Sequence, residues 1–267
     1  MKLINDDSLY LSEEEFSKYS KRLIGEGKDA KVYAYSNEFL LKIYKECTSI
    51  ISFEKFDTAN GVLKAYSPSI IREAIVRQKF IKNTSLPLAI VYVDGIFKGS
   101  LIRRHRCSFE LHKVWGLLSH KKRCLVLRRL LNNVKELNDN FIYHFDLTNR
   151  PDGVGSDDYS HSNILISRGF DVNIIDLDGR STIYTDKRDL SYESIVYSSL
   201  LSLIIELITD YDIPNDMTPE DKMFYERELL KHGFSDKIIS SLVGEEGRYV
   251  EVDSLISLYE EKKLLLK

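Results

Sequence analysis

The stretch RLIGEGKDAKVYAYSNEFLLKIYK, residues 22–45, decides how the first part of the chain folds. Apolar and polar side chains alternate through residues 32–34, and a second apolar run follows at residues 40–43. Such alternation is typical of strands that bury one face of a sheet. Ser36 and Asn37 lie between the two runs, where a hairpin turn is expected. The stretch therefore predicts two paired strands.

The sequence on either side of this hairpin adds helices and a second hairpin. Ser12 and Glu15 have the spacing of a capping box, which predicts a short helix over residues 13–20. Residues 69–83 have helical periodicity. In LPLAIVYVDGIFKGSLI, the pair Asp94-Gly95 predicts a tight turn between two strands.

The pattern changes to helix after about Arg106. Leu-rich periodicity runs through residues 109–138, and short apolar strands are expected in the segments FIYHFDL, NILI and VNIID. Further helical runs cover residues 193–209 and the segment from Thr218 onward. We therefore expect a single α+β domain over residues 1–267. Its strand-rich lobe (about 1–102) and helix-rich lobe (about 108–267) are joined near residues 103–107, with the crevice between them as the default ligand site.

Composition narrows the class of protein. The chain has 267 residues, 41 acidic and 38 basic, and its formal charge of -3 argues against a general nucleic-acid binder. Three cysteines without CxxC spacing favour free thiols in a reducing compartment. The acidic N-terminus lacks the apolar core of a signal peptide, and the apolar run at 195–208 is too short to span a bilayer. We expect a cytoplasmic protein that uses no membrane.

Gly25-Glu26-Gly27 lies between two strand-like segments. A dinucleotide-binding fingerprint must open a helix, so this context argues against one. A glycine-rich hairpin can instead lay its backbone amides over phosphates. An ordinary glycine turn explains the same residues and stays an alternative.

Lys42 lies inside the apolar run Leu40–Ile43. A lysine in a buried strand must place its ammonium against an anion or bear a desolvation cost. Glu73, on the expected helix 69–83, is a candidate counter-ion, and such a pair would hold the lysine ready for a phosphate oxygen. The alternative is an edge-strand lysine that points to water.

Asn163 and Asp176 follow one another on short strand-and-loop segments, in SHSNILI and VNIIDLDG. Amide and carboxylate oxygens are hard ligands that suit Mg²⁺. Either residue alone is more often a turn or a cap. Together, between apolar strands, they form a more specific signal for a divalent cation.

In order along the chain, these features resemble the protein kinase superfamily. The glycine-rich loop reads Gly25-x-Gly27-x-x-Ala30-x-Val32, and the strand lysine and helix glutamate are Lys42 and Glu73. The catalytic-loop segment is His144-Phe145-Asp146-Leu147, followed by Asn163 and by Asp176-Leu177-Asp178 in place of DFG. LNDNFIYHFDL, residues 137–147, resembles the kinase stretch that leads from a long helix into the catalytic loop. The resemblance covers roughly residues 21–207.

The resemblance implies a bilobal kinase-like fold and a role for each matched residue. Gly25, Gly27 and Val32 would cover ATP, and Lys42, held by Glu73, would contact its α- and β-phosphates. Asn163 and Asp176 would bind Mg²⁺. Segment 101–106 would form the hinge whose backbone pairs with adenine. A catalytic-loop aspartate would accept or orient the proton of the attacking hydroxyl.

The catalytic aspartate has two candidates. In the family the aspartate and asparagine are five residues apart, whereas Asp146 and Asn163 are seventeen apart; Asp158 has the family spacing. The approach from residue 137 favours Asp146, with NRPDGVGSDDYS as an inserted loop. The spacing back from Asn163 favours Asp158. We prefer Asp146 and keep Asp158 open.

Other departures concern the substrate. Phe145 replaces the arginine that reads a phosphorylated activation loop in many kinases, and only about fifteen residues separate Gly179 from the helix expected near Ser194. We expect an ATP- and Mg²⁺-dependent serine/threonine protein kinase of a divergent, bacterial type, acting on a protein substrate, with autophosphorylation included. The alternatives are a small-molecule kinase resembling the aminoglycoside and choline phosphotransferases, and a nucleotide-binding pseudokinase.

Overall fold

The computed structural model divides the chain into two compact units, described separately below. Unit 1 consists of Met1–Arg106 together with Ile174–Tyr184, and unit 2 consists of Cys107–Asn173 and Thr185–Lys267. The structure describes residues 7–27, 30–45, 67–78, 81, 84–147, 163–177, 182–209, 211, 213, 218–243 and 248–264.

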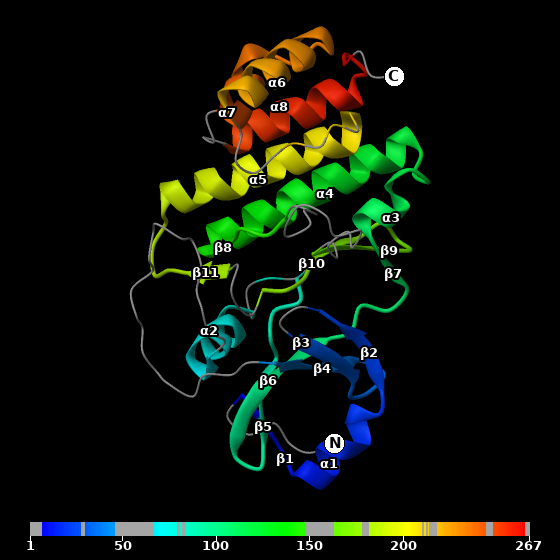
Figure 1. The fold of residues 1–267 in the computed structure, drawn as a ribbon, viewed down its shortest axis with the longest axis vertical. Coiled ribbons are helices and arrows are strands. Elements are labelled where there is room, and N and C mark those ends of the chain that lie inside the picture. The colour runs from blue at the N-terminus through cyan, green and yellow to red at the C-terminus, as the bar shows by residue number, and fades with distance from the viewer. Residues whose placement is uncertain are drawn as a thin grey trace. The chain divides into compact units, whose positions relative to one another are not determined.

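Unit 1 is built on a six-stranded sheet with the strand order β1-β5-β6-β4-β3-β2 (Figure 1). β1 pairs with β5 in parallel, and the other neighbours pair antiparallel. The sequence did not indicate β1, which is only four residues long. The six strands are β1 (Ser8–Leu11), β2 (Leu23–Glu26), β3 (Ala30–Ala34), β4 (Phe39–Tyr44), β5 (Ala89–Val93) and β6 (Ile96–Arg103).

Both predicted hairpins are confirmed. β3 and β4 pair around a turn in which the Ser36 hydroxyl accepts hydrogen bonds from the amides of Glu38 and Phe39, both at 3.1 Å. β5 and β6 are joined by Asp94 and Gly95, with φ of 47° and 78°. Two consecutive left-handed residues make the turn whose twist matches that of the strands, which is why Asp-Gly is favoured there.

Two helices cover opposite faces of this sheet. α1 (Glu13–Ser20) begins at the predicted Ser12–Glu15 capping box, and its Phe16 packs on the face that contains Leu41. α2 (Pro68–Gln78) packs Ile71 and Ile75 against the other face. Successive strand residues point to opposite faces. Lys42, next to Leu41, therefore faces the α2 side.

Unit 2 contains a small sheet and a set of packed helices. β7 (Ser108–Glu110), β9 (Ile164–Ser167) and β10 (Val172–Ile174) form a sheet in the order β10-β9-β7. The helices α4, α5 and α8 lie side by side, with α6 and α7 beyond them (Figure 1). The remaining elements are α3 (Leu111–Trp115), α4 (His120–Asp139), β8 (Ile142–His144), β11 (Thr182–Tyr184, in unit 1), α5 (Leu190–Thr209), α6 (Pro219–Lys231), α7 (Asp236–Val243) and α8 (Tyr249–Glu260).

The segment 109–138 is not the continuous helical run that its periodicity suggests. It begins in β7, continues as α3, and breaks before α4. The chain turns out of helical geometry at Ser119, which is extended (φ -64°, ψ 155°) and forms the N-cap of α4. Serine is common at this position, although the Ser119 side chain makes no capping hydrogen bond here. Leu117 in the break is 84% exposed, so the apolar repeat does not report burial there.

The core of unit 2 lies among α4, α5 and α8. Leu127, Leu130 and Leu131 of α4 and Leu200 and Ile204 of α5 are almost fully buried. The apolar run at 195–208 lies in α5, which has 20 residues and is the one helix in the described ranges that is long and apolar enough to cross a membrane. The expectation that the run is too short is therefore wrong, but 61% of the apolar window is buried inside the protein. This burial is that of a core helix.

Candidate functional site

Three predicted site residues form one row across the sheet of unit 1. Gly25 lies opposite Val32, Val32 lies opposite Lys42, and Lys42 lies opposite Ser100. Residues directly opposite one another in antiparallel strands project to the same face. The register therefore brings Gly25, Val32 and Lys42 together. Their spacing along the chain does not by itself determine this.

In the glycine-rich turn, the Glu26 carboxylate is paired with two lysines. The Glu26 carboxylate accepts a hydrogen bond from Lys45 at 2.8 Å and pairs with Lys31 at 3.5 Å. The Lys45 hydrogen bond, together with both lysine charges, lowers the pKa of Glu26. The turn closes with the Gly27 amide donating to the Ala30 carbonyl at 2.9 Å. Negative charge at this turn is thus offset by two lysines.

Lys42 contacts Asp176. The lysine is 9% exposed and its ammonium donates to a carboxylate oxygen of Asp176, 134 positions away in sequence. The ammonium also lies 5.8 Å from the ring centroid of Tyr44 on the same face. A buried ammonium needs an anionic partner. The interpretation of Lys42 as an edge lysine pointing to water is therefore wrong.

Glu73 has a partner on its own helix. Its Oε1 accepts a hydrogen bond from the Nε of Arg77, one turn later, at 2.7 Å, and forms an ion pair with the Nη2 of the same arginine at 2.7 Å. The arginine side chain is 13% exposed and the glutamate side chain 43%. The Lys42–Glu73 pair stays a prediction, and in this structure the two residues are engaged by Asp176 and Arg77.

The segment that carries Asp176 belongs to unit 1 and is held there by the residue before it. Before it, the Ile174 carbonyl accepts a hydrogen bond from the Ser85 amide at 2.9 Å, and Ile174 bridges Thr84 in parallel. Asp176 itself has a φ of 66°. A non-glycine residue in the left-handed region is uncommon and persists only where its surroundings hold it. After it, Leu177 is fully buried.

Asp146 and Asn163 meet in unit 2. The Asn163 Nδ2 donates to the Asp146 carbonyl and to its Oδ2, both at 2.9 Å. Asp146 follows β8, and Asn163 immediately precedes β9. Because Nδ2 faces Asp146, the Asn163 carbonyl Oδ1 is directed elsewhere and can act as a ligand. Asp158 lies outside the described residues, so its place in the site stays a prediction.

Phe145 packs against an aromatic side chain. Its ring lies 5.7 Å from that of Tyr192 in the first turn of α5, at 70° to it. Tyr192 also packs on Tyr143, and the Tyr143 hydroxyl accepts a hydrogen bond from the Asp189 amide at 2.8 Å. Where the family often has an arginine, this chain thus has an apolar contact that secures the start of α5 to β8.

The donor set for a cation is small. Among the residues that the structure describes, no three His, Cys, Asp or Glu side chains gather as a metal site. Mg²⁺ commonly uses only one or two protein oxygens and completes its shell with water and substrate phosphates. The Asp176 carboxylate in unit 1 and the Asn163 Oδ1 in unit 2 are each an oxygen ligand of that kind.

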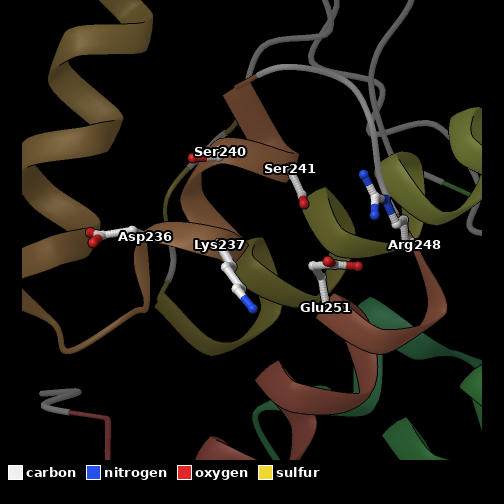
Figure 2. Close-up of a pocket in the computed structure, with 6 residues that line it drawn as sticks. All are labelled: Asp236, Lys237, Ser240, Ser241, Arg248 and Glu251. Atoms are coloured by element: carbon white, nitrogen blue, oxygen red, sulfur yellow. The ribbon is translucent and has the colours of Figure 1, made fainter.

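A separate polar pocket of about 370 Å³ lies in unit 2, between α7 and α8 (Figure 2). It contains none of the predicted site residues. Lys237, Ser241, Arg248 and Glu251 project toward the open space in the picture. The full lining is Asp236, Lys237, Ser240, Ser241, Arg248 and Glu251.

Two residues that matter to the site escaped the sequence analysis. Gly99 lies opposite Ile43, and a Cβ added to it would fall 1.9 Å from the Lys42 carbonyl oxygen. Ser85 holds Ile174, as described above, and its hydroxyl contacts the ring of His105. A glycine inside a strand can indicate such a close approach. Nothing in the local sequence distinguishes Ser85.

Comparison with known proteins gives a fold. No family model matches the sequence, and no curated protein does so. Among the solved structures that match is one described as an apo pseudokinase. It is 12% identical and has a TM-score of 0.56, over 98% of this chain and 97% of that one. The chain therefore has the α+β fold of the protein kinases, with a β-rich N-terminal part and a helical C-terminal part, as its sequence predicts.

Proposed function

We propose that this chain, which has the protein kinase fold, is an ATP- and Mg²⁺-dependent phosphotransferase. The observation that carries the proposal is the contact between the buried Lys42 and Asp176. The contact joins a cation suited to phosphate oxygens to a carboxylate suited to Mg²⁺. A buried lysine–carboxylate pair contributes little net stability compared with apolar residues packed in its place, so stability alone is a weak explanation for this pair.

The proposed reaction gives separate roles to the predicted site residues of the two units. Gly25 and Val32, in the row of Lys42, cover the nucleotide, and Lys42 binds its phosphates. Asp176 and the Asn163 Oδ1 hold Mg²⁺, which when bound neutralises charge on the phosphates. Asp146 orients the acceptor hydroxyl and takes its proton. The acceptor oxygen then bonds to the γ-phosphorus, the bond to the β–γ bridging oxygen breaks, and ADP leaves.

The Asn163 hydrogen bonds support Asp146 as the catalytic aspartate. They bring together two residues that are seventeen positions apart, so that a close Asp–Asn pair like that of the protein kinases forms without the usual spacing. Asp158 stays the alternative within the proposal.

We assign the acceptor as a serine or threonine hydroxyl of a protein, including the chain itself. One observation favours a second candidate, a small hydroxylated molecule. Between Leu177 and the start of α5 at Leu190 the chain has room for only β11 and short connections. Such a segment offers little surface on which an extended peptide can lie.

The test follows the γ-phosphoryl group of ATP with Mg²⁺ on the wild type and on Asp176→Ala, Asp146→Asn and Asp158→Asn. Asp171→Asn is the matched control, since its side chain is 61% exposed and pairs with Arg129 on the surface. We expect label on protein in the wild type and the control, none in Asp176→Ala, and a loss of about 10²–10⁴-fold in Asp146→Asn.

Other outcomes discriminate the candidates. Label that appears only on added hydroxylated compounds, such as aminoglycosides or choline, favours the small-molecule kinase. A dead Asp158→Asn beside an active Asp146→Asn moves the catalytic role to Asp158. A wild type that binds ATP without turnover is a pseudokinase, and one that binds no ATP overturns the proposal.

A further inference from the structure

β11 (Thr182–Tyr184) follows Asp176 within unit 1, and one of its side chains contacts the backbone beside Asp176. The Tyr184 hydroxyl donates a hydrogen bond to the backbone carbonyl of Leu177. Leu177 is the residue that follows Asp176. Tyr184 thus binds the backbone of the residue next to Asp176, whose carboxylate contacts Lys42.

We propose that Tyr184 is a positioning residue for Asp176. Asp176 has a left-handed backbone, with φ at 66°. Its aspartate side chain brings no steric relief of the kind that glycine has, so neighbouring contacts must maintain this conformation. The Ser85–Ile174 hydrogen bond holds the chain before Asp176, and the Tyr184–Leu177 hydrogen bond holds it after. The inference rests on the proposed function, because it gives Asp176 the role of a Mg²⁺ ligand.

Tyr184 is itself held by α2. The guanidinium of Arg77 lies 5.9 Å from the centroid of the Tyr184 ring, within the range of a cation–π contact. Glu73 fixes that guanidinium through the two 2.7 Å contacts. A continuous set of contacts therefore runs from Glu73 through Arg77 and Tyr184 to Leu177.

This arrangement gives Glu73 a task that does not require contact with Lys42. By fixing Arg77, the glutamate sets the position of the Tyr184 ring, and the ring sets the direction of its hydroxyl. Residues that orient a metal ligand without touching the metal commonly change metal affinity by 10–100-fold. Loss of the Tyr184 hydroxyl is therefore expected to weaken Mg²⁺ binding more than nucleotide binding.

The test uses Tyr184→Phe, which keeps the ring on Arg77 and removes the hydroxyl. Tyr211→Phe is the matched control, since it removes one hydroxyl, 3.0 Å from the His232 ring, in unit 2. The first measurement is hydrogen exchange of the amides at residues 175–177 without nucleotide. We expect exchange at least about tenfold faster in Tyr184→Phe and unchanged in Tyr211→Phe. Equal exchange in the wild type and Tyr184→Phe overturns the inference.

The second measurement is the affinity for ATP, titrated with Mg²⁺ and repeated in EDTA. We expect Tyr184→Phe to need about tenfold more Mg²⁺ for half of the metal-dependent gain, with ATP affinity in EDTA within about twofold of wild type. Equal weakening with and without metal shows a structural role alone and overturns the inference. A wild type that binds no ATP overturns the proposed function, and with it the role of Tyr184 in metal binding. Faster exchange in Tyr184→Phe would in that case still show that the Tyr184 hydroxyl holds the Leu177 backbone.

Discussion

Asn163 donates both to the backbone carbonyl and to a carboxylate oxygen of Asp146, although seventeen positions separate them in the chain. The two residues are held by separate strands, since Asp146 follows β8 and Asn163 precedes β9. The contact is thus set by the described parts of unit 2 on either side of residues 148–162.

This contact predicts a pH-dependent defect in Asn163→Asp. The substitution places a second carboxylate against Asp146, and two carboxylates that share a site raise the pKa of one of them. Stability is then lost at neutral pH, where both are ionised, by about 1–2 kcal/mol. It returns toward pH 5 as the pair takes up a proton. Urea unfolding at both pH values measures this, with Asn163→Ala as the control. A loss of equal size at both pH values would contradict the prediction.

Gly99 predicts a large effect from one methyl group. In Gly99→Ala the new Cβ meets the Lys42 carbonyl oxygen at 1.9 Å, so β4 and β6 must separate beside the proposed site. We expect a loss of about 3 kcal/mol in the free energy of unfolding, the upper end of the cost of overpacking. Gly116→Ala is the control, since its added Cβ has open space and its φ is -60°. Denaturant unfolding compares the two, and similar values would be inconsistent with the geometry.

His105 predicts that stability falls on acidification. Burial lowers the pKa of His105, and the nearby charge of Arg103 lowers it further. As pH drops below the unfolded value of about 6.5, the unfolded chain takes up a proton that the folded chain does not. The free energy of unfolding therefore decreases as pH falls, until His105 is protonated in the folded state as well.

The check is the difference between wild type and His105→Gln in melting temperature from pH 7.5 to 5.5. Glutamine keeps a polar group beside Ser85 but does not titrate. The wild type should lose more than the variant across this range. Parallel curves would show that other groups carry the pH dependence.

The pocket in Figure 2 predicts that one charge can be removed at no cost. Oε2 of Glu251 is buried and has no hydrogen-bond partner in the described part of the chain. A buried acceptor without a donor is destabilising, and more so when it is charged. Glu251→Gln should therefore leave the free energy of unfolding unchanged or raise it by up to about 1 kcal/mol. Glu261→Gln, at the exposed C-terminal end of the same helix, controls for net charge. A clear loss of stability in Glu251→Gln alone would argue against this interpretation.

The features that the sequence predicted well are those set by neighbours in the chain. The Ser12–Glu15 capping box and the Asp94-Gly95 turn need only a few residues in a fixed order, and both are found as predicted. The strand position of Lys42 follows from its apolar neighbours, and the fold class follows from the order of strands and helices. Local backbone preference is consistent with the fold at these points.

The features that escaped prediction depend on partners far along the chain. β1 has only four residues and becomes a strand because β5 accepts it. The break between α3 and α4 falls within an unbroken leucine repeat, so periodicity cannot locate it. The role proposed for Tyr184 depends on its contacts with Leu177 and Arg77, which lie elsewhere in the chain. No window of sequence contains these pairs.

The edge pairing of β1 has a consequence for synthesis on the ribosome. Ser8–Leu11 is translated roughly eighty residues before its partner Ala89–Val93. At ordinary rates of elongation, β1 therefore has no β5 to pair with for several seconds. Ile174–Tyr184 is translated later still, after α3 and α4 of unit 2. The N-terminal unit therefore cannot be finished before the ribosome is well into the C-terminal one.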